Sequence, residues 1–202
     1  MKGQQFVVNV DNKLPVHIVW DKFLPDDQNR KCLDMFLEKE TEFVASKVNH
    51  GQLDGERRRS KSYTTSSDVK SLLEAALQPT LPELFSGLRT GQPEKPKFEF
   101  QSVAHQDGDY YRVHIDTAMR QTGARRLISC VYYLHSHPKA FSGGHLRLYS
   151  INGKTHVDIE PQNNQIIFFP SFYPHEVLPT CVGSKLFAHS RFSIAGWINK
   201  HL

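Results

Sequence analysis

Two His-x-Asp pairs stand out among the side chains of this sequence that could bind a metal: His114-Ile115-Asp116 and His156-Val157-Asp158. Side chains two positions apart on a β-strand point to the same face, so either pair could place an imidazole and a carboxylate on one ion. A non-haem Fe(II) centre needs one further imidazole on that face and leaves its other positions open. A bare His-x-Asp pair is more often the polar end of a strand. A third candidate ligand is therefore needed to identify which pair, if either, binds a metal.

The spacing to a third histidine separates the two pairs. His175, in the segment SFYPHEVLP, follows His114 by 61 residues, with several predicted strands between them. It follows His156 by only 19 residues, which are too few for the chain to travel round a barrel and return. His114, Asp116 and His175 are therefore the predicted metal ligands.

A candidate anion-binding residue follows 16 positions after His175. Arg191 begins the segment RFSIAGWI, where strand alternation places Arg191, Ser193 and Trp197 on one face and apolar residues on the other. A buried, unpaired arginine is costly, but its planar fork is well suited to a carboxylate. The alternative is a solvent-facing arginine at the edge of a sheet.

The first half of the chain must support these residues, and it predicts one strand and two helices. Residues 16–20 read as a strand, and Asp26 or Asp27 can begin a helix. The apolar positions of this helix recur at helical spacing: Cys32, Leu33, Phe36, Leu37 and Phe43. A second helix is expected from Ser66 or Ser67 to the prolines at 79 and 82. Between them, residues 57–61 form a basic run that is expected to be a solvated loop, with a docking surface for an acidic partner as the alternative.

From about residue 97 the pattern becomes all strand, interrupted by Gly, Pro and Asn turns. The candidate strands are 97–105, 109–115, 126–135, 144–150, 155–159, 165–169, 174–178 and 187–198. Short strands at this spacing indicate a double-sheet jelly roll, that is, a double-stranded β-helix. The expected fold class is α+β, with N-terminal helices buttressing one sheet. We expect one domain over 1–202, with a helical support region at 1–96 and the jelly roll at 97–202.

Composition excludes several classes of protein. Hydrophobic residues make up 39% of 202 residues, enough for a packed core and too many for a disordered chain. The formal net charge of +4 is too small to suggest a nucleic-acid binder, and no apolar run is long enough to span a membrane. No secretory signal is expected at the N-terminus. The three cysteines are far apart in the sequence, which favours a reducing, cytoplasmic location.

Seven motifs follow one another between about residues 98 and 198: YYRVHID, CVYYL, SGGHLRLY, VDIEP, IIFFP, PHEVLP and RFSIAGW. In these motifs and in their order, the segment resembles the prolyl-hydroxylase-like group of 2-oxoglutarate- and Fe(II)-dependent oxygenases. It is especially similar to the branch that contains the hypoxia-inducible-factor prolyl hydroxylases and their bacterial relatives. More weakly, DKFLPDD and RRRSKSY resemble the family's opening strand-to-helix turn and its basic loop.

The resemblance implies that His114, Asp116 and His175 bind Fe(II), with 2-oxoglutarate and O2 as cosubstrates and ascorbate as a further candidate cofactor. It implies that Arg191 and Tyr133 hold the distal carboxylate of 2-oxoglutarate. Because the His-to-Arg spacing is longer than the family norm, Lys185 remains an alternative to Arg191. A tyrosine that some relatives place before the His-x-Asp pair has no match here, where Ala104 and His105 occupy that region.

The implied activity is hydroxylation of an unactivated C–H bond with release of succinate and CO2. A prolyl residue of a protein or peptide is the expected substrate, and the long polar loop at 50–66 could fold over such a chain as a lid. The alternatives are hydroxylation of a small molecule or free amino acid, and a non-catalytic jelly-roll module that binds a metal or ligand. No nucleic-acid or membrane partner is expected, and the oligomeric state stays open.

Overall fold

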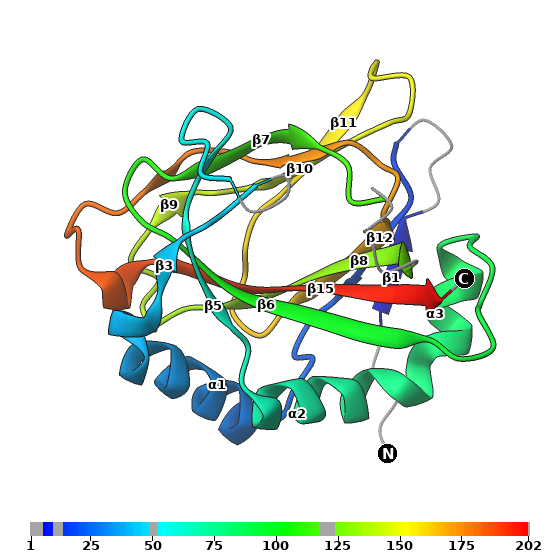
Figure 1. Ribbon diagram of the computed structural model, residues 1–202, viewed down its shortest axis with the longest axis horizontal. Helices are drawn as coiled ribbons and strands as arrows, with labels where there is room; N and C mark the ends of the chain where they lie inside the picture. Colours follow the sequence, from blue (N-terminus) through cyan, green and yellow to red (C-terminus); the bar gives the residue numbers. More distant parts are fainter. Residues whose placement is uncertain (1–5, 10–13, 49–51, 118–123, 202) are drawn as a thin grey trace.

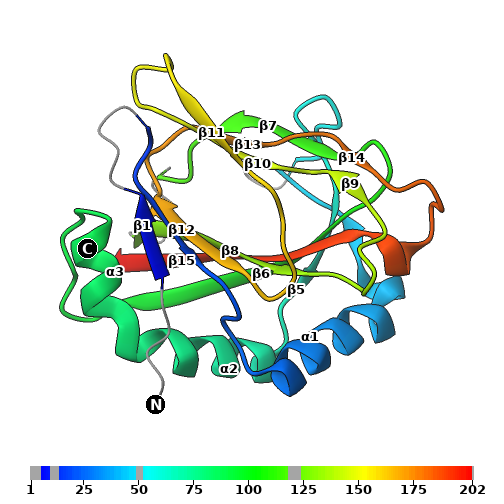
Figure 2. The same ribbon diagram turned by 180° about the vertical axis from the view of Figure 1, so that it is seen from behind.

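The computed structural model describes residues 6–9, 14–48, 52–117 and 124–201. Two antiparallel β-sheets face each other, and the helices lie beneath the larger sheet (Figure 1). This two-sheet arrangement is that of a jelly roll. Figure 2 shows from behind that α1 and α2 run along the same side of the larger sheet. None of the helices among the described residues is long and apolar enough to cross a membrane.

The larger sheet has eight strands in the order β1-β2-β12-β8-β15-β6-β5-β3. Their bounds are β1 Phe6–Asn9, β2 His17–Trp20, β3 Val44–Ala45, β5 Lys61–Thr64, β6 Lys97–His105, β8 Ala124–Leu134, β12 Ile166–Pro170 and β15 Arg191–His201. The long strand β15 lies at the middle of this sheet, between β6 and β8. Every residue of β12 is buried, as its apolar sequence IIFFP requires.

The smaller sheet has five strands in the order β11-β10-β13-β7-β4. Their bounds are β4 Arg58–Arg59, β7 Tyr110–His114, β10 Leu146–Tyr149, β11 His156–Ile159 and β13 His175–Val177. A separate pair joins β9 Ser142–Gly143 to β14 Thr180–Cys181. The predicted strands of the second half correspond to β6, β7, β8, β10, β11, β12, β13 and β15, with ends displaced by a few residues.

Three α-helices occur in the described part of the chain: α1 Asp26–Glu38, α2 Ser67–Leu77 and α3 Leu81–Gly87. Short 3-10 turns occupy Glu40–Glu42, Gln78–Thr80 and Phe187–His189. In α2 the hydroxyl of Ser66 accepts the backbone N–H of Val69, which caps the helix. The buried residues Val69, Leu73 and Leu77 recur every four positions and join the main core.

Three expectations from the sequence were wrong. Helix α1 ends at Glu38, so Phe43 lies beyond it, after the 3-10 turn, although it is still buried in the core. The basic run is not a loop throughout, because Arg58–Arg59 pairs with β7 and Lys61–Thr64 pairs with β6. The proposed lid therefore contains sheet strands, and its residues 50 and 51 lie outside the described residues. The last strand begins at Arg191 rather than at 187, since Phe187–His189 forms a 3-10 turn.

Candidate metal centre

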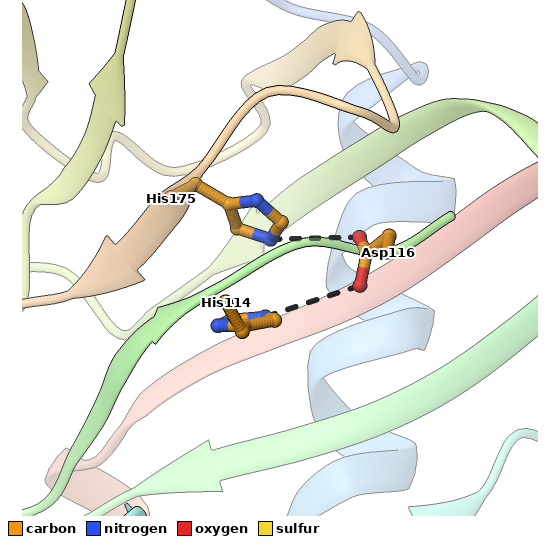
Figure 3. A group of neighbouring side chains, drawn as sticks. All are labelled: His114, Asp116 and His175. Carbon is orange, nitrogen blue, oxygen red and sulfur yellow. Dashed lines mark ion pairs between the residues drawn. The ribbon is translucent and has the colours of Figure 1, made fainter. Parts of the chain in front are cut away.

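His114, Asp116 and His175 lie together between the two sheets, as Figure 3 shows. His114 ends β7 and His175 begins β13, and these two residues are direct partners in the antiparallel register. His114 Nε2 lies 3.9 Å from Asp116 Oδ1, and His175 Nε2 lies 3.5 Å from Asp116 Oδ2. One ligand atom from each residue falls within 4.8 Å of the others, so the three side chains can share one ion. The structure thus brings together the three residues that the sequence predicted.

Main-chain carbonyl groups orient both imidazoles. His114 Nδ1 lies 2.8 Å from the carbonyl oxygen of Arg112, and His175 Nδ1 lies 3.0 Å from that of Tyr173. A carbonyl can only accept, so Nδ1 carries the proton in each ring and Nε2 keeps a free lone pair. Burial, reinforced by the neighbouring His175, lowers the pKa of His114 to about 3. The neutral imidazole that a metal requires is therefore the stable form.

Asp116 is held by two donors that sequence reasoning missed. Its Oδ2 accepts the hydroxyl of Ser129 at 2.7 Å and the indole N–H of Trp197 at 2.8 Å. Arg126 adds a longer charge contact of 3.8 Å to Oδ1. Burial opposes ionisation of this carboxyl, but the two histidines and the two donors outweigh it and lower its pKa. Trp197 lies on the same face of its strand as Arg191, and this strand alternation could have predicted from the sequence that Trp197 faces the site.

The second His-x-Asp pair is used differently. Asp158 forms a two-bond ion pair with Arg147, at 2.6 and 2.7 Å, across the β10–β11 ladder. His156 is exposed at the start of β11. Among the described residues, the group that could hold a metal comprises His114, Asp116 and His175, without this pair.

A second polar cluster surrounds Arg191, whose side chain is buried with 1% exposure. Arg191 Nε donates to the carbonyl of Gly144 at 2.7 Å, and Nη1 contacts Ser193 Oγ at 3.3 Å. Its guanidinium carbon lies 4.9 Å from the centre of the Tyr133 ring. Nη1 also lies 3.4 Å from His105 Nδ1, which must accept this bond and so leaves the proton on Nε2.

Four donors of this cluster are buried without a hydrogen-bond partner among the described residues. They are Arg191 Nη2, Tyr133 Oη, His105 Nε2 and Thr180 Oγ1. Buried donors left unpaired cost free energy, and a carboxylate is the kind of acceptor that such donors bind. Burial lowers the pKa of His105 well below its usual value, so this imidazole stays neutral beside the arginine. Lys185, the alternative anion-binding residue, is exposed on a turn.

The strand register connects this cluster to the metal ligands. On β8 and β15, Ser129 pairs with Trp197 and Tyr133 pairs with Ser193. Residues 129 and 133 therefore share one face of β8, about 13 Å apart along the strand at 3.3 Å per residue. The donors that hold Asp116 and the donors around Arg191 thus project from one face of the larger sheet.

Comparison with known proteins agrees with the resemblance described from the sequence. Residues 100–199 match the family described as the 2OG-Fe(II) oxygenase superfamily. An uncharacterized PKHD-type hydroxylase of Synechocystis is 36% identical over 192 residues, which cover 89% of this chain and 62% of that protein. A hypoxia-inducible factor prolyl hydroxylase of Caenorhabditis elegans is 35% identical over 94 residues, 45% of this chain and 12% of the relative. The chain thus spans less than two thirds of the length of either relative.

The fold also has solved counterparts. The crystal structure of a Pseudomonas putida prolyl-4-hydroxylase superimposes with a TM-score of 0.69 at 26% sequence identity. The match covers 91% of this chain and 92% of that one.

Proposed function

Because residues 100–199 of this chain belong to the 2OG-Fe(II) oxygenase superfamily, we propose that the protein is a 2-oxoglutarate-dependent hydroxylase. The observation that carries the proposal is the convergence of His114, Asp116 and His175 with both Nε2 atoms free. Two imidazoles and one carboxylate are the ligand set of non-haem Fe(II) oxygenases. When bound, Fe(II) with 2-oxoglutarate and O2 supplies an oxidant for an unactivated C–H bond, and succinate and CO2 are released.

The protein's own residues would hold and orient these groups. His114, Asp116 and His175 would bind the iron, and Ser129 and Trp197 would fix the orientation of the Asp116 carboxylate. Arg191 and Tyr133 would bind the distal carboxylate of 2-oxoglutarate, as the resemblance implies. The unpaired donors around Arg191 fit this group, because each of them needs an acceptor.

We propose further that the substrate is a prolyl residue of a protein or peptide. Two similar proteins support this: one is a hypoxia-inducible factor prolyl hydroxylase and the other is a prolyl-4-hydroxylase. Hydroxylation of a free amino acid or other small molecule is the alternative. In this proposal, residues 1–202 act as one dioxygenase unit in which 1–96 support the catalytic strands of 97–202.

The described cysteines are unpaired, in keeping with a reducing compartment.

The test is direct. The purified protein is incubated with Fe(II), 2-oxoglutarate and a peptide extract, and succinate and peptides heavier by one oxygen atom are measured. We expect His114→Ala, Asp116→Ala and His175→Ala to abolish succinate formation and to weaken iron binding. His156→Ala is the matched control and should keep most activity, since its side chain is exposed outside the triad.

A protein that binds iron but forms no succinate with any substrate would support the non-catalytic binding module instead. An inactive His156→Ala variant beside an active His114→Ala variant would show that the wrong His-x-Asp pair was chosen.

A further inference from the structure

Arg58 is linked to the candidate metal ligands through an aromatic ring. It lies on β4 opposite Tyr111 of β7, and paired residues of neighbouring strands point to the same face. The Arg58 guanidinium carbon lies 4.8 Å from the centre of the Tyr111 ring. Tyr111 in turn stacks on His114, with ring centres 3.6 Å apart. Arg58, Tyr111 and His114 therefore form a stack that ends at a proposed iron ligand.

The Arg58 side chain is held in place by a hydrogen bond to a residue two positions further along the chain. Its Nε donates to Ser60 Oγ at 2.8 Å, and Ser60 is itself bonded to Ser46. Burial lowers the pKa of Arg58, while the nearby Tyr111 and Asp116 favour its charged form. The guanidinium is thus a positioned, half-buried cation rather than a mobile surface charge.

Arg58 has no carboxylate within ion-pair distance in the described part of the chain, whereas two other arginines of the sheets do. Arg126 pairs with Glu99 at 2.8 Å, and Arg147 pairs with Asp158 at 2.6 Å. Arg191 also lacks such a partner among the described residues, but its partner in the proposed function is the distal carboxylate of 2-oxoglutarate. Arg58 is then an arginine near the metal ligands that has no carboxylate partner of its own among the described residues.

The charges of the loaded site lead to the same result. In the proposed function, Asp116 and one carboxylate of 2-oxoglutarate would balance the charge of Fe(II), and Arg191 would balance the other carboxylate. Both histidines are neutral in the orientation seen here. The charge of Arg58 remains, in a partly desolvated position where an ion pair is stronger than in water.

We propose that Arg58 binds a carboxylate of the substrate, so that the preferred substrate carries an acidic group close to the carbon that is hydroxylated. This inference rests on the proposed hydroxylase function and specifies its substrate class. The carboxylate can belong to an Asp or Glu residue beside the modified position of a peptide, or to a small carboxylic acid. Arg59, the next residue of β4, is exposed and pairs with Tyr110 on the opposite face, so it provides a matched control.

The experiment uses fluorescein-labelled peptides with blocked ends and a central proline, flanked by Asp, Asn or Lys in otherwise identical sequences. Binding to the metal-free protein is measured by fluorescence anisotropy, and hydroxylation is measured by mass spectrometry after addition of Fe(II) and 2-oxoglutarate. We expect Asp peptides to bind at least tenfold more tightly than their Asn counterparts, as a charge-assisted hydrogen bond would provide. Free proline and prolinamide form a second arm for small acids, in which only the former carries a carboxylate.

Variants then assign the preference to Arg58. In Arg58→Gln the Asp and Asn peptides should bind alike, and in Arg58→Glu the Lys peptides should bind best. Arg59→Gln should keep the wild-type preference. If only free proline shows a carboxylate preference that depends on Arg58, the carboxylate site stands and its source is a small acid.

Equal binding of Asp and Asn peptides and of proline and prolinamide by the wild-type protein would overturn the inference, as would an equal loss of preference in Arg59→Gln. If Asp, Asn and Lys peptides are hydroxylated equally well, the inference about Arg58 fails but the proposed hydroxylase function stands. Absence of succinate and of any added oxygen, with carboxylate-dependent binding intact, would overturn the proposed hydroxylase function and leave the carboxylate site in place.

Discussion

At the residue scale, the candidate site depends on hydrogen-bond partners that are easily overlooked. The backbone carbonyls of Arg112 and Tyr173 decide which nitrogen of each histidine faces the metal. Ser129 and Trp197 both bond to Oδ2 of Asp116, which leaves Oδ1 free of hydrogen bonds from these two donors. Such partners commonly change metal affinity or activity 10–100-fold when they are replaced.

The assignment of the cosubstrate cation is testable with single residues. We expect Arg191→Ala to raise the 2-oxoglutarate requirement about tenfold to more than a hundredfold, because a charge-assisted pair contributes roughly 1.5–3 kcal/mol. Tyr133→Phe removes one neutral donor and should cost less. Lys185→Ala should leave the requirement unchanged, since Lys185 is exposed. Apparent 2-oxoglutarate affinities measured side by side check this, and a larger loss in Lys185→Ala than in Arg191→Ala would reverse the assignment.

At the element scale, the turn that leads into β10 shapes the arginine cluster. Gly144 has a φ of 64°, and its carbonyl accepts the bond from Arg191 Nε. A Cβ at this position would lie 2.6 Å from Arg191 Cδ and 2.8 Å from Thr180 Oγ1. A side chain at 144 would therefore displace two of the residues that carry unpaired donors.

Gly144→Ala should both destabilise the protein and weaken 2-oxoglutarate binding. Gly153→Ala is its matched control, because Gly153 has a φ of 68° but nothing lies within 4 Å of its added Cβ. Backbone strain of about 1–3 kcal/mol applies to both variants. Only Gly144→Ala should lose cosubstrate affinity, measured by titration with 2-oxoglutarate. A similar affinity loss in Gly153→Ala would mean that strain alone, not crowding of Arg191, is responsible.

At the scale of the whole molecule, buried histidines connect folding to pH. His17, His105 and His135 are all buried, and desolvation is the main cause that lowers the pKa of each. His17 lies on β2, where its Nδ1 is 2.8 Å from the carbonyl of Pro15. In the unfolded chain these imidazoles regain a pKa near 6.5. Below that pH the unfolded chain therefore binds more protons than the folded protein does.

The free energy of unfolding should therefore be largest above pH 6.5 and should fall as the pH decreases below that value. Each histidine contributes at most about 1.4 kcal/mol per pH unit. Urea unfolding at pH 7.5, 6.5 and 5.5 measures the slope, and His17→Gln should make it shallower by its share. A stability that stays constant or rises from pH 7.5 to 5.5 would contradict the assignment of these histidines as neutral.

The sequence by itself predicted the two longer helices, the main strands of the second half and the three candidate metal ligands. Alternation on strands, the helical spacing of Val69, Leu73 and Leu77, and the Ser66 cap are local patterns, because neighbouring residues impose them. The choice of His114 and Asp116 with His175 needed only the number of residues required to cross a barrel. Short strands without such a pattern, among them Arg58–Arg59 and Ser142–Gly143, were missed.

Only the tertiary structure decided which distant residues meet. The contacts of Asp116 with Ser129 and Trp197, and of Arg191 with His105 and Gly144, join segments that are far apart in the chain. Arg58 reaches Tyr111 only because β4 pairs with β7, so a basic run that resembles a solvated loop places a cation beside the ring that stacks on His114. These contacts follow from strand register and burial, which depend on the whole sheet and leave no periodic signal in the residues themselves.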